Sequence, residues 1–303
     1  MKQEIITRLE QVLTQEKIRQ NEPMKNHTTF RVGGPADIFL TPAADELAAV
    51  LAVCKDGGVP VTVIGNGSNL LVGDKGIRGV VISIGAGMRK ITVEGEKIYL
   101  EAGVPLAAAA MQAAKAGLTG LEFASGIPGT FGGAVVMNAG AYGGEMKDVI
   151  VSVRVLKRDG DIITLTKEEL DLSYRHSVIP ERDYLVVDGE LLLAHAEKPE
   201  QIMQRMEELK KQRVEKQPLE YPSAGSTFKR PEGYFAGKLI MDAGLRGFSV
   251  GGAAVSEKHC GFVVNKGGAT AADICTLMDE VTKIVQEKYA VTLEPEVKKV
   301  GEF

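Results

Sequence analysis

The segment Ala-Ser-Gly-Ile-Pro-Gly-Thr-Phe-Gly-Gly-Ala occupies residues 124–134, and Asn-Ala-Gly-Ala-Tyr-Gly-Gly follows at residues 138–144. Glycine loses more conformational freedom on folding than any other residue, so such a dense run of small residues is costly. The cost makes sense where the backbone must lie against a flat or extended ligand. Composition alone leaves two interpretations open, a ligand-binding backbone and an irregular glycine-rich loop.

A second glycine-containing loop, Gly-Asn-Gly-Ser-Asn at residues 65–69, follows an apolar run at residues 59–64 that is typical of a buried strand. Its two glycines permit successive peptide N–H groups to point inward, an arrangement that binds phosphate oxygens. Ser68 and Asn69 add side-chain donors. Leu70 occupies the place of the third glycine of a dinucleotide fingerprint, which argues against a Rossmann dehydrogenase. A tight turn between strands remains the alternative interpretation.

Composition excludes several classes of protein. The chain has 303 residues, a length that suits two or three domains, and 36 Lys and Arg against 40 Asp and Glu give a net charge of −4. This balance argues against a dedicated nucleic-acid binder. The cysteines, at positions 54, 260 and 275, lack the spacing of a disulfide framework or a zinc site, so no metal is expected. With no apolar leader and no apolar run long enough to cross a membrane, we expect a cytoplasmic protein.

Helical and strand patterns mix along the chain without a regular βαβ alternation, which predicts an α+β fold. Asp159-Gly160 lies between alternating apolar residues and predicts a hairpin turn. The apolar residues expected on one side of the helix at 199–217 are Ile202, Met206, Leu209 and Val214. Strands are predicted at 59–64, 70–72, 79–84, 91–93, 97–100, 151–157, 161–165 and 184–194, and helices from Ile5 to Leu13 and at 45–55, 105–116, 199–217 and 271–289.

Three polar positions carry no signal by themselves. Arg175 follows Tyr174, Ser226 lies in Gly-Ser-Thr-Phe-Lys at residues 225–229, and Glu296 lies in Leu-Glu-Pro-Glu-Val at residues 293–297. Taken singly, each reads as structural: a surface arginine, a turn serine and a solvated glutamate.

Together, these segments resemble a known family. Residues 63–71 and 125–133 resemble the flavin-binding domain of the vanillyl-alcohol-oxidase-like flavoproteins. Tyr174-Arg175 and the segments 225–229 and 293–297, in that order, narrow the resemblance to the UDP-N-acetylenolpyruvoylglucosamine reductases. The similarity runs from about Asn26 to Val300. Only 50 residues separate Arg175 from Ser226, which is typical of the shorter class that lacks a tyrosine-bearing loop over the substrate.

The resemblance implies a vanillyl-alcohol-oxidase-like fold of two FAD-binding subdomains, residues 1–82 and 83–195, and a C-terminal α+β substrate domain, residues 196–303. It implies non-covalent FAD, NADPH as co-substrate, and reduction of the enolpyruvyl group of a UDP-sugar in peptidoglycan precursor synthesis. The implied partners are therefore small molecules rather than nucleic acid or membrane.

The resemblance also assigns roles to residues. Arg175 stabilises the enolate, Ser226 donates a proton to C2, and Glu296, protonated or hydrogen-bonded, assists. Lys229, Lys216 and Arg213 are candidates for the substrate's phosphates, with ordinary surface positions as their alternative, and Tyr174 joins them as a substrate-binding residue. The predicted cofactor-binding residues are Gly65, Asn66, Gly67, Ser68, Asn69, Ser125, Gly126, Ile127, Gly129, Thr130, Gly133, Ala134, Asn138, Gly140 and Ala141.

Two competing hypotheses remain open. One keeps the flavin but changes the chemistry to that of an alcohol or sugar oxidase. The other is a nucleotide- or flavin-binding module without catalysis. Neither accounts for the combination of Arg175, Ser226 and Glu296.

Overall fold

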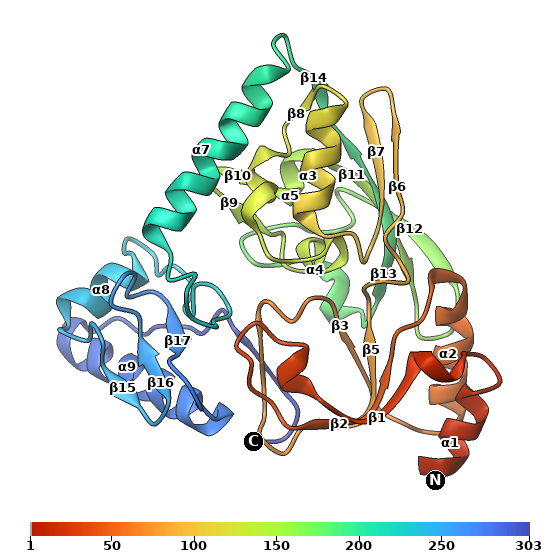
Figure 1. Ribbon diagram of the computed structural model, residues 1–303, viewed down its shortest axis with the longest axis horizontal. Helices are drawn as coiled ribbons and strands as arrows, with labels where there is room; N and C mark the ends of the chain where they lie inside the picture. The colour runs from red at the N-terminus through yellow and green to blue at the C-terminus, as the bar shows by residue number, and fades with distance from the viewer. Residues whose placement is uncertain (1) are drawn as a thin grey trace. The chain divides into compact units, whose positions relative to one another are not determined.

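A computed structural model of the chain describes residues 2–303, and these form two compact units (Figure 1). Unit 1 contains residues 2–19, 38–66 and 79–213, and unit 2 contains residues 20–37, 67–78 and 214–303. The chain therefore passes between the units repeatedly. One passage falls inside the 65–69 loop, between Asn66 and Gly67. The division into residues 1–82, 83–195 and 196–303 stays a prediction.

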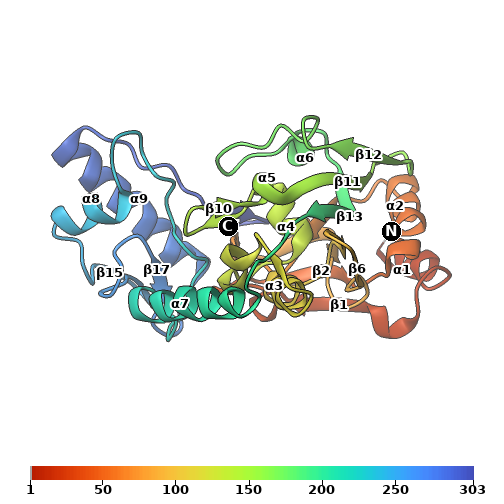
Figure 2. The ribbon, with the colours of Figure 1, turned by 90° about the horizontal axis from the view of Figure 1, so that it is seen from above.

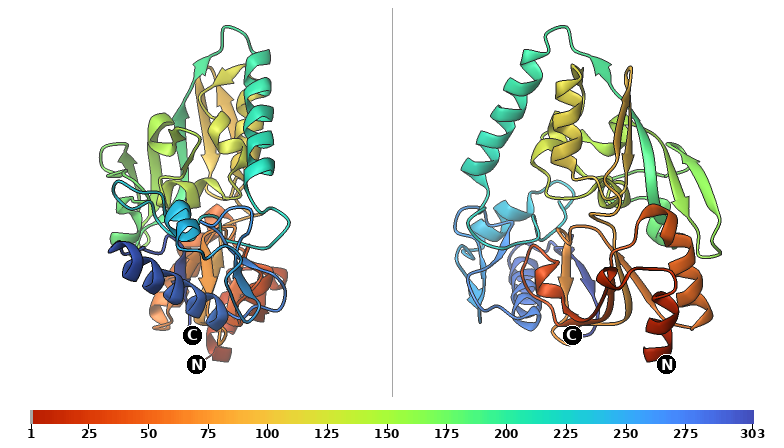
Figure 3. Two further views of the ribbon diagram at one scale, coloured as in Figure 1. Left: turned by 90° about the vertical axis from the view of Figure 1, so that its left-hand side faces the viewer. Right: turned by 45° about the vertical axis from the view of Figure 1, so that its right-hand side comes forward.

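The centre of unit 1 is an antiparallel sheet with the order β12-β11-β13-β7-β6, visible in green and yellow in the right-hand view of Figure 3. The hairpin β11–β12, whose turn holds Gly160 at φ +98°, confirms the predicted hairpin, and the strands predicted at 91–93 and 97–100 pair as the hairpin β6–β7. The strands are β6 (Ile91–Glu94), β7 (Lys97–Glu101), β11 (Ile150–Leu156), β12 (Ile162–Thr166) and β13 (Leu185–Leu192).

Two helices that matter for the site, α3 (Leu106–Lys115) and α4 (Phe131–Val136), lie on one face of this sheet (Figure 1). Phe131 is fully buried, and a Cβ atom at Gly189 of β13 would lie 2.8 Å from its ring. The missing side chain at position 189 therefore lets Phe131 fix α4 on the sheet. Around them lie α5 (Met146–Val149), α6 (Val178–Glu181), α7 (Glu200–Lys216), η4 (Glu122–Gly126), and the short strands β8 (Leu118–Thr119), β9 (Gly140–Ala141), β10 (Gly144–Glu145) and β14 (Ala194–His195).

The N-terminal part of the chain adds a second sheet with the order β1-β2-β5-β3. Strands β3 and β5 are parallel, and Val61 pairs with Val80. The elements are α1 (Lys2–Leu9), η1 (Gln15–Lys17), β1 (Ile18–Pro23), η2 (Met24–Asn26), β2 (Pro35–Leu40), η3 (Ala44–Glu46), α2 (Leu47–Asp56), β3 (Val61–Ile64) and β5 (Ile77–Ser83).

Unit 2 packs the long helix α9 (Ala271–Tyr289) against α8 (Ala236–Asp242) and against the strands β15 (Ser249–Val250) and β16 (Ala253–Val255). Strand β17 (Val263–Asn265) pairs with β16 and completes the antiparallel sheet, and Figure 2 shows α8, α9, β15 and β17 in this unit. A separate parallel pair joins β4 (Leu70–Val72) to β18 (Lys298–Val300). The buried face of α9 consists of Ile274, Leu277, Met278, Val281 and Val285.

Several predictions are confirmed and some need correction. The α+β class is confirmed, and the helix at 271–289 has the predicted ends. The first helix ends at Leu9 and is followed by a turn, so the predicted end at Leu13 is wrong. Val214 was expected on the apolar face of α7 but is 54% exposed, since that face ends with Leu209. No helix among residues 2–303 is long and apolar enough to cross a membrane.

Candidate functional site

In unit 1, the first part of the 65–69 loop meets the glycine-rich segment. A Cβ atom at Gly65 would lie 2.6 Å from Thr130 Oγ1, so only glycine fits there without displacing the threonine. The Asn66 side-chain amide donates a hydrogen bond to the Pro128 carbonyl at 3.1 Å. The two segments identified from the sequence are therefore neighbours in space.

Thr130 lies within this segment and immediately precedes α4. Its residue is 1% exposed, and its Oγ1 atom is buried with no hydrogen-bond partner among the described residues. It does not cap α4 through its side chain. Within residues 2–303, the peptide N–H groups of Gly129, Thr130 and Gly133 also donate to no protein acceptor. The segment therefore presents hydrogen-bond donors that the protein itself does not use.

Other predicted cofactor residues serve the local structure. Ser125 Oγ donates to the Glu122 carbonyl at 2.8 Å, which fixes η4. Gly140 and Ala141 form β9 and pair with β10. The buried Asn138 amide donates to Glu145 Oε2 (2.7 Å) and the Ser173 carbonyl (3.0 Å), and its Oδ1 accepts the Lys147 N–H (2.9 Å). Any contact of Asn138 with a cofactor would therefore use its backbone.

Arg175 stands on a tight turn in which Ser173 and His176 exchange backbone hydrogen bonds of 3.3 and 3.2 Å. Its φ is +55°, a left-handed conformation that is uncommon for a non-glycine residue and often marks a functional site. The Arg175 guanidinium lies 5.0 Å from the Tyr174 ring centroid. The Asn138 amide holds one end of the turn, and Ser177 Oγ holds the other through the Val136 carbonyl at 2.8 Å. The turn is thus tied to the end of α4.

In unit 2, Ser226 and Glu296 come together through Thr227. The buried Thr227 accepts the Glu296 N–H on its carbonyl (2.8 Å), donates its N–H to the Gly261 carbonyl (2.8 Å), and accepts the Val263 N–H on Oγ1 (2.8 Å). Lys229 N–H donates to the Glu294 carbonyl at 2.8 Å and continues this pairing. We call residues 226–229 and 294–296 the paired strip. Ser226 is exposed beside Gly225, whose φ is +76°.

The second part of the 65–69 loop lies against the same strip. Asn69 Nδ2 donates to the Glu296 carbonyl at 3.1 Å, and Asn69 O accepts the Lys298 N–H at 2.9 Å. Gly67 has φ +61°, which glycine adopts without strain. The loop therefore supports the glycine-rich segment in unit 1 and the Glu296 segment in unit 2.

The basic residues predicted to bind substrate phosphates differ in their surroundings. A Cβ atom at Gly126 would lie 3.3 Å from Arg213 Cδ and Nη1, so Arg213 covers the glycine-rich segment of unit 1. Burial lowers the pKa of Arg213. Lys229 pairs with Glu294 at 3.1 Å in unit 2, and Lys216 is exposed at the end of α7. Their roles stay predictions.

The residues present suit FAD. The orphaned Thr130 hydroxyl and the unused N–H groups provide donors for phosphate oxygens, and the glycine at position 65 provides room for a close approach.

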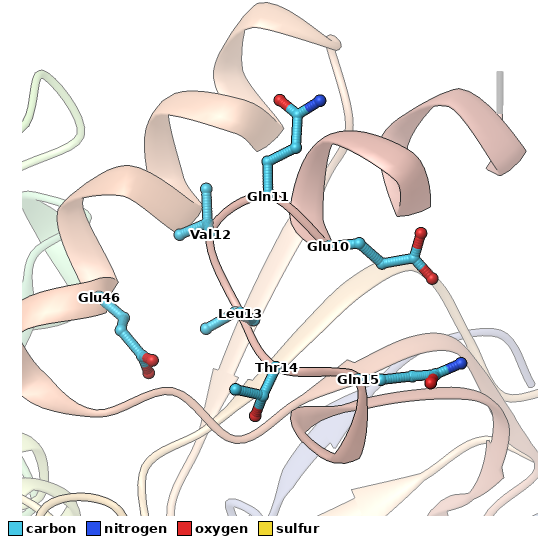
Figure 4. Close-up of a pocket in the computed structure, with 7 residues that line it drawn as sticks. All are labelled: Glu10, Gln11, Val12, Leu13, Thr14, Gln15 and Glu46. Carbon is cyan, nitrogen blue, oxygen red and sulfur yellow. The ribbon is translucent and has the colours of Figure 1, made fainter.

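A surface pocket of about 620 Å³ lies elsewhere in unit 1 and contains none of the predicted site residues (Figure 4). Residues 10–15 and Glu46 line it. The pKa of Glu46 is lowered overall. Burial acts to raise it, but the hydrogen bonds from Ala43 N–H and Lys17 together have the larger effect.

Sequence reasoning missed Thr227, which positions both proposed catalytic residues of unit 2. Its motif was identified, but its bonds to Gly261, Val263 and Glu296 join segments far apart in the chain. The sequence carried no signal that separates the two neighbouring hydroxyl residues, because the exposure of Ser226 and the burial of Thr227 are seen only in the structure. No cluster of metal-ligating side chains occurs in the part of the chain that the structure describes.

Comparison with known proteins gives independent findings. Residues 217–300 match the family model of the UDP-N-acetylenolpyruvoylglucosamine reductase C-terminal domain, and residues 36–166 match an FAD binding domain. A UDP-N-acetylenolpyruvoylglucosamine reductase of Agathobacter rectalis is 58% identical over 100% of both chains. One from Lachnoclostridium phytofermentans is 55% identical, over 98% of this chain and 97% of that one.

Solved structures agree. UDP-N-acetylenolpyruvylglucosamine reductase from Thermus caldophilus is similar with a TM-score of 0.80 and 38% identity, over 93% of this chain and 99% of that one. An alkyldihydroxyacetonephosphate synthase at 15% identity and a TM-score of 0.50 shares the fold alone, over 64% of this chain and 40% of that one. The predicted vanillyl-alcohol-oxidase-like fold with a C-terminal α+β part is confirmed. The chain belongs to the UDP-N-acetylenolpyruvoylglucosamine reductase family.

Proposed function

We propose that this chain reduces the enolpyruvyl group of UDP-N-acetylenolpyruvoylglucosamine to give UDP-N-acetylmuramate, with NADPH as reductant and FAD as cofactor, in peptidoglycan precursor synthesis. The observation that carries the proposal is identity of 58% over the full length of a relative with this activity in its name. The FAD-binding domain and the unused donors beside Gly65 support the cofactor.

FAD held by the glycine-rich segment and the 65–69 loop would supply the redox chemistry that links NADPH to C3 of the enolpyruvyl group. Hydride addition at C3 moves negative charge through C2 into the substrate carboxylate. Arg175 binds that carboxylate, and a preoriented guanidinium stabilises the charge as it develops. Its turn, fixed by Asn138 and Ser177, holds the side chain without reorganisation during the reaction.

Ser226 then supplies the proton that C2 requires. A serine hydroxyl is a weak acid, but a strongly basic enolate accepts from it when the geometry is held. The paired strip provides this rigidity through the backbone of Thr227, and it presents Glu296 from the neighbouring segment. Glu296 assists the enolate and Arg175. Because the three cysteines are free, as is usual in a reducing compartment, we also assign the reaction to the cytoplasm.

The test measures the flavin content and the NADPH oxidation of the purified protein. The protein should be yellow, should release free FAD in acid, and should oxidise NADPH rapidly only when the enolpyruvyl UDP-sugar is present. Rapid aerobic oxidation of an alcohol would instead support an oxidase. Tight binding of flavin without turnover would support a binding module. A colourless protein that FAD does not reconstitute contradicts the proposal.

A further inference from the structure

Buried side-chain atoms without a hydrogen-bond partner are rare among residues 2–303. They are Thr130 Oγ1, Thr29 Oγ1 and Glu190 Oε1, and the last lies 2.7 Å from Lys97 Nζ in an ion pair. A buried hydroxyl without a partner is a cost that proteins seldom leave uncorrected. The proposed cofactor site explains Thr130. Thr29 has no assigned role.

Thr29 lies in a segment of unit 2 whose neighbouring residues make hydrogen bonds on both sides of it. The preceding Thr28 donates from Oγ1 to the Val32 carbonyl at 2.9 Å. The following Phe30 is fully buried, and its carbonyl accepts from Asn265 Nδ2 at 3.1 Å. The segment is therefore held firmly on both sides of Thr29. The orphaned hydroxyl is an exception within an ordered structure, not a sign of loose packing.

The segment also touches the 65–69 loop. Thr29 N–H donates to the Gly67 carbonyl at 3.3 Å, and a Cβ atom at Gly67 would collide with the backbone of His27 and Thr28. Within the described chain, the peptide N–H groups of Gly67 and Ser68 donate to no protein acceptor. One hydroxyl and two N–H groups, all potential donors, therefore belong to adjoining residues of one unit. Donors without acceptors suit an anionic oxygen.

We propose that Thr29 is an FAD-binding residue whose hydroxyl donates to a phosphate oxygen of the dinucleotide, together with the N–H groups of Gly67 and Ser68. The proposal rests on the proposed function, which makes FAD the resident diphosphate. The hydroxyl is covered in the structure, so FAD binding includes a rotation of the Thr29 side chain between staggered positions. UDP-sugars and NADPH also carry diphosphates, but the 65–69 loop lies within residues 36–166, which match an FAD binding domain.

The two adjacent threonines provide a matched pair of variants. Thr29→Val removes a hydroxyl that has no hydrogen-bond partner in the described part of the chain, so the apoprotein should melt at or above the wild-type temperature. Thr28→Val removes a made hydrogen bond, so the apoprotein should melt at a lower temperature. Thr29→Ser keeps a hydroxyl and should bind FAD nearly as well as wild type.

The experiment titrates FAD into apoprotein prepared from each full-length enzyme and follows the flavin fluorescence. We expect the Kd of Thr29→Val for FAD to rise about 10- to 100-fold, the scale of one hydrogen bond to a charged group. ADP, which carries a diphosphate without a flavin, competes with FAD and should lose affinity by a similar factor. With FAD saturating, the KM values for NADPH and for the UDP-sugar should stay within about twofold of wild type.

The outcomes separate the proposals. If wild-type apoprotein fails to bind FAD, the proposed function fails. If wild type binds FAD and Thr29→Val binds it within twofold of wild type, the inference about Thr29 is wrong. An unchanged affinity for ADP would overturn the assignment to the diphosphate. A raised KM for NADPH or the UDP-sugar at saturating FAD, with FAD affinity intact, would move Thr29 to a substrate site.

Discussion

The glycine-rich segment of unit 1 and the paired strip of unit 2 are built on opposite principles. In the first, a buried hydroxyl and several peptide N–H groups have no partner among residues 2–303. In the second, the backbone of Thr227 and of Glu296 is paired, and the functional side chains project from it. Unsatisfied donors suit a permanently bound cofactor, since the cofactor completes them. Satisfied backbone suits catalytic side chains, since it fixes them before the substrate arrives.

Ser226→Ala tests the role of the paired strip, and we expect it to have the largest effect on catalysis. Ser226 acts only on C2 of the substrate, so reoxidation of the reduced enzyme by the UDP-sugar should slow by about 10²–10⁴-fold. Reduction of bound FAD by NADPH should stay near wild type, and FAD content should be unchanged. Stopped-flow absorbance of the flavin measures each half-reaction separately.

Cysteine at position 226 is the matched control, because a thiol also donates a proton and should retain more activity than alanine. If Ser226→Ala slowed flavin reduction and spared reoxidation, Ser226 would belong to the NADPH site. The comparison would then be wrong for the paired strip.

Arg175→Lys tests the turn in unit 1. The substitution keeps the charge but replaces a planar fork with a point charge on a flexible stem, which binds a carboxylate less specifically. We expect turnover to fall about 10²-fold, the scale for removal of one preoriented anion stabiliser. Steady-state kcat with saturating UDP-sugar measures the loss. Near-normal turnover would contradict the role of Arg175.

Asn138→Ala asks whether the turn depends on its side-chain support. The variant loses the three hydrogen bonds of the buried Asn138 amide, each worth about 1 kcal/mol, so it should cost about 2–4 kcal/mol of unfolding free energy. Turnover should fall about tenfold, less than for Arg175→Lys, because a mispositioned guanidinium still reaches the carboxylate in part. Urea unfolding and steady-state kinetics measure the two effects. A stable variant with normal turnover would show that the turn holds itself.

Local patterns predicted the elements whose signal is local. The apolar period of residues 271–289 and the Asp159-Gly160 turn have the predicted structures. Helix α4 was not predicted, because two glycines in Phe131–Val136 disfavour a helix. It forms because Phe131 packs against Gly189 of β13, a contact that lies outside any sequence window. Tertiary packing there overrides propensity.

Sequence prediction reached the same limit at the candidate site. The site residues were predicted, but the long-range contacts that position them were not. Asn69 reaches the Glu296 carbonyl across 227 residues of sequence, and β4 pairs with β18 across a similar separation. No local periodicity reports such pairings. The positive φ of Arg175 was equally hidden, since glycine is the usual signal for that conformation.

The smallest expected effect is a change in stability at a helix N-terminus, where the two threonines that precede α4 and α9 can be compared. Thr130 leaves α4 uncapped, whereas Thr270 Oγ1 accepts the Asp273 N–H at 3.0 Å, and Asp273 Oδ2 accepts the Thr270 N–H at 3.0 Å. The hydrogen bond from the Thr270 backbone lowers the pKa of Asp273, against the opposing effect of burial.

Because the pKa of Asp273 in the folded state lies below its value in the unfolded state, the carboxylate stabilises the fold above about pH 4 and loses that effect as the pH falls through the folded value. Asp273→Asn should therefore cost about 1 kcal/mol at pH 7 and less near pH 3. Urea midpoints of the apoproteins of the variant and of wild type at both pH values measure the difference, with the apoprotein of Thr130→Val, whose hydroxyl has no partner among residues 2–303, as a control that should not be destabilised. An Asp273→Asn deficit that stayed constant with pH would mean that the carboxylate charge contributes nothing to the cap.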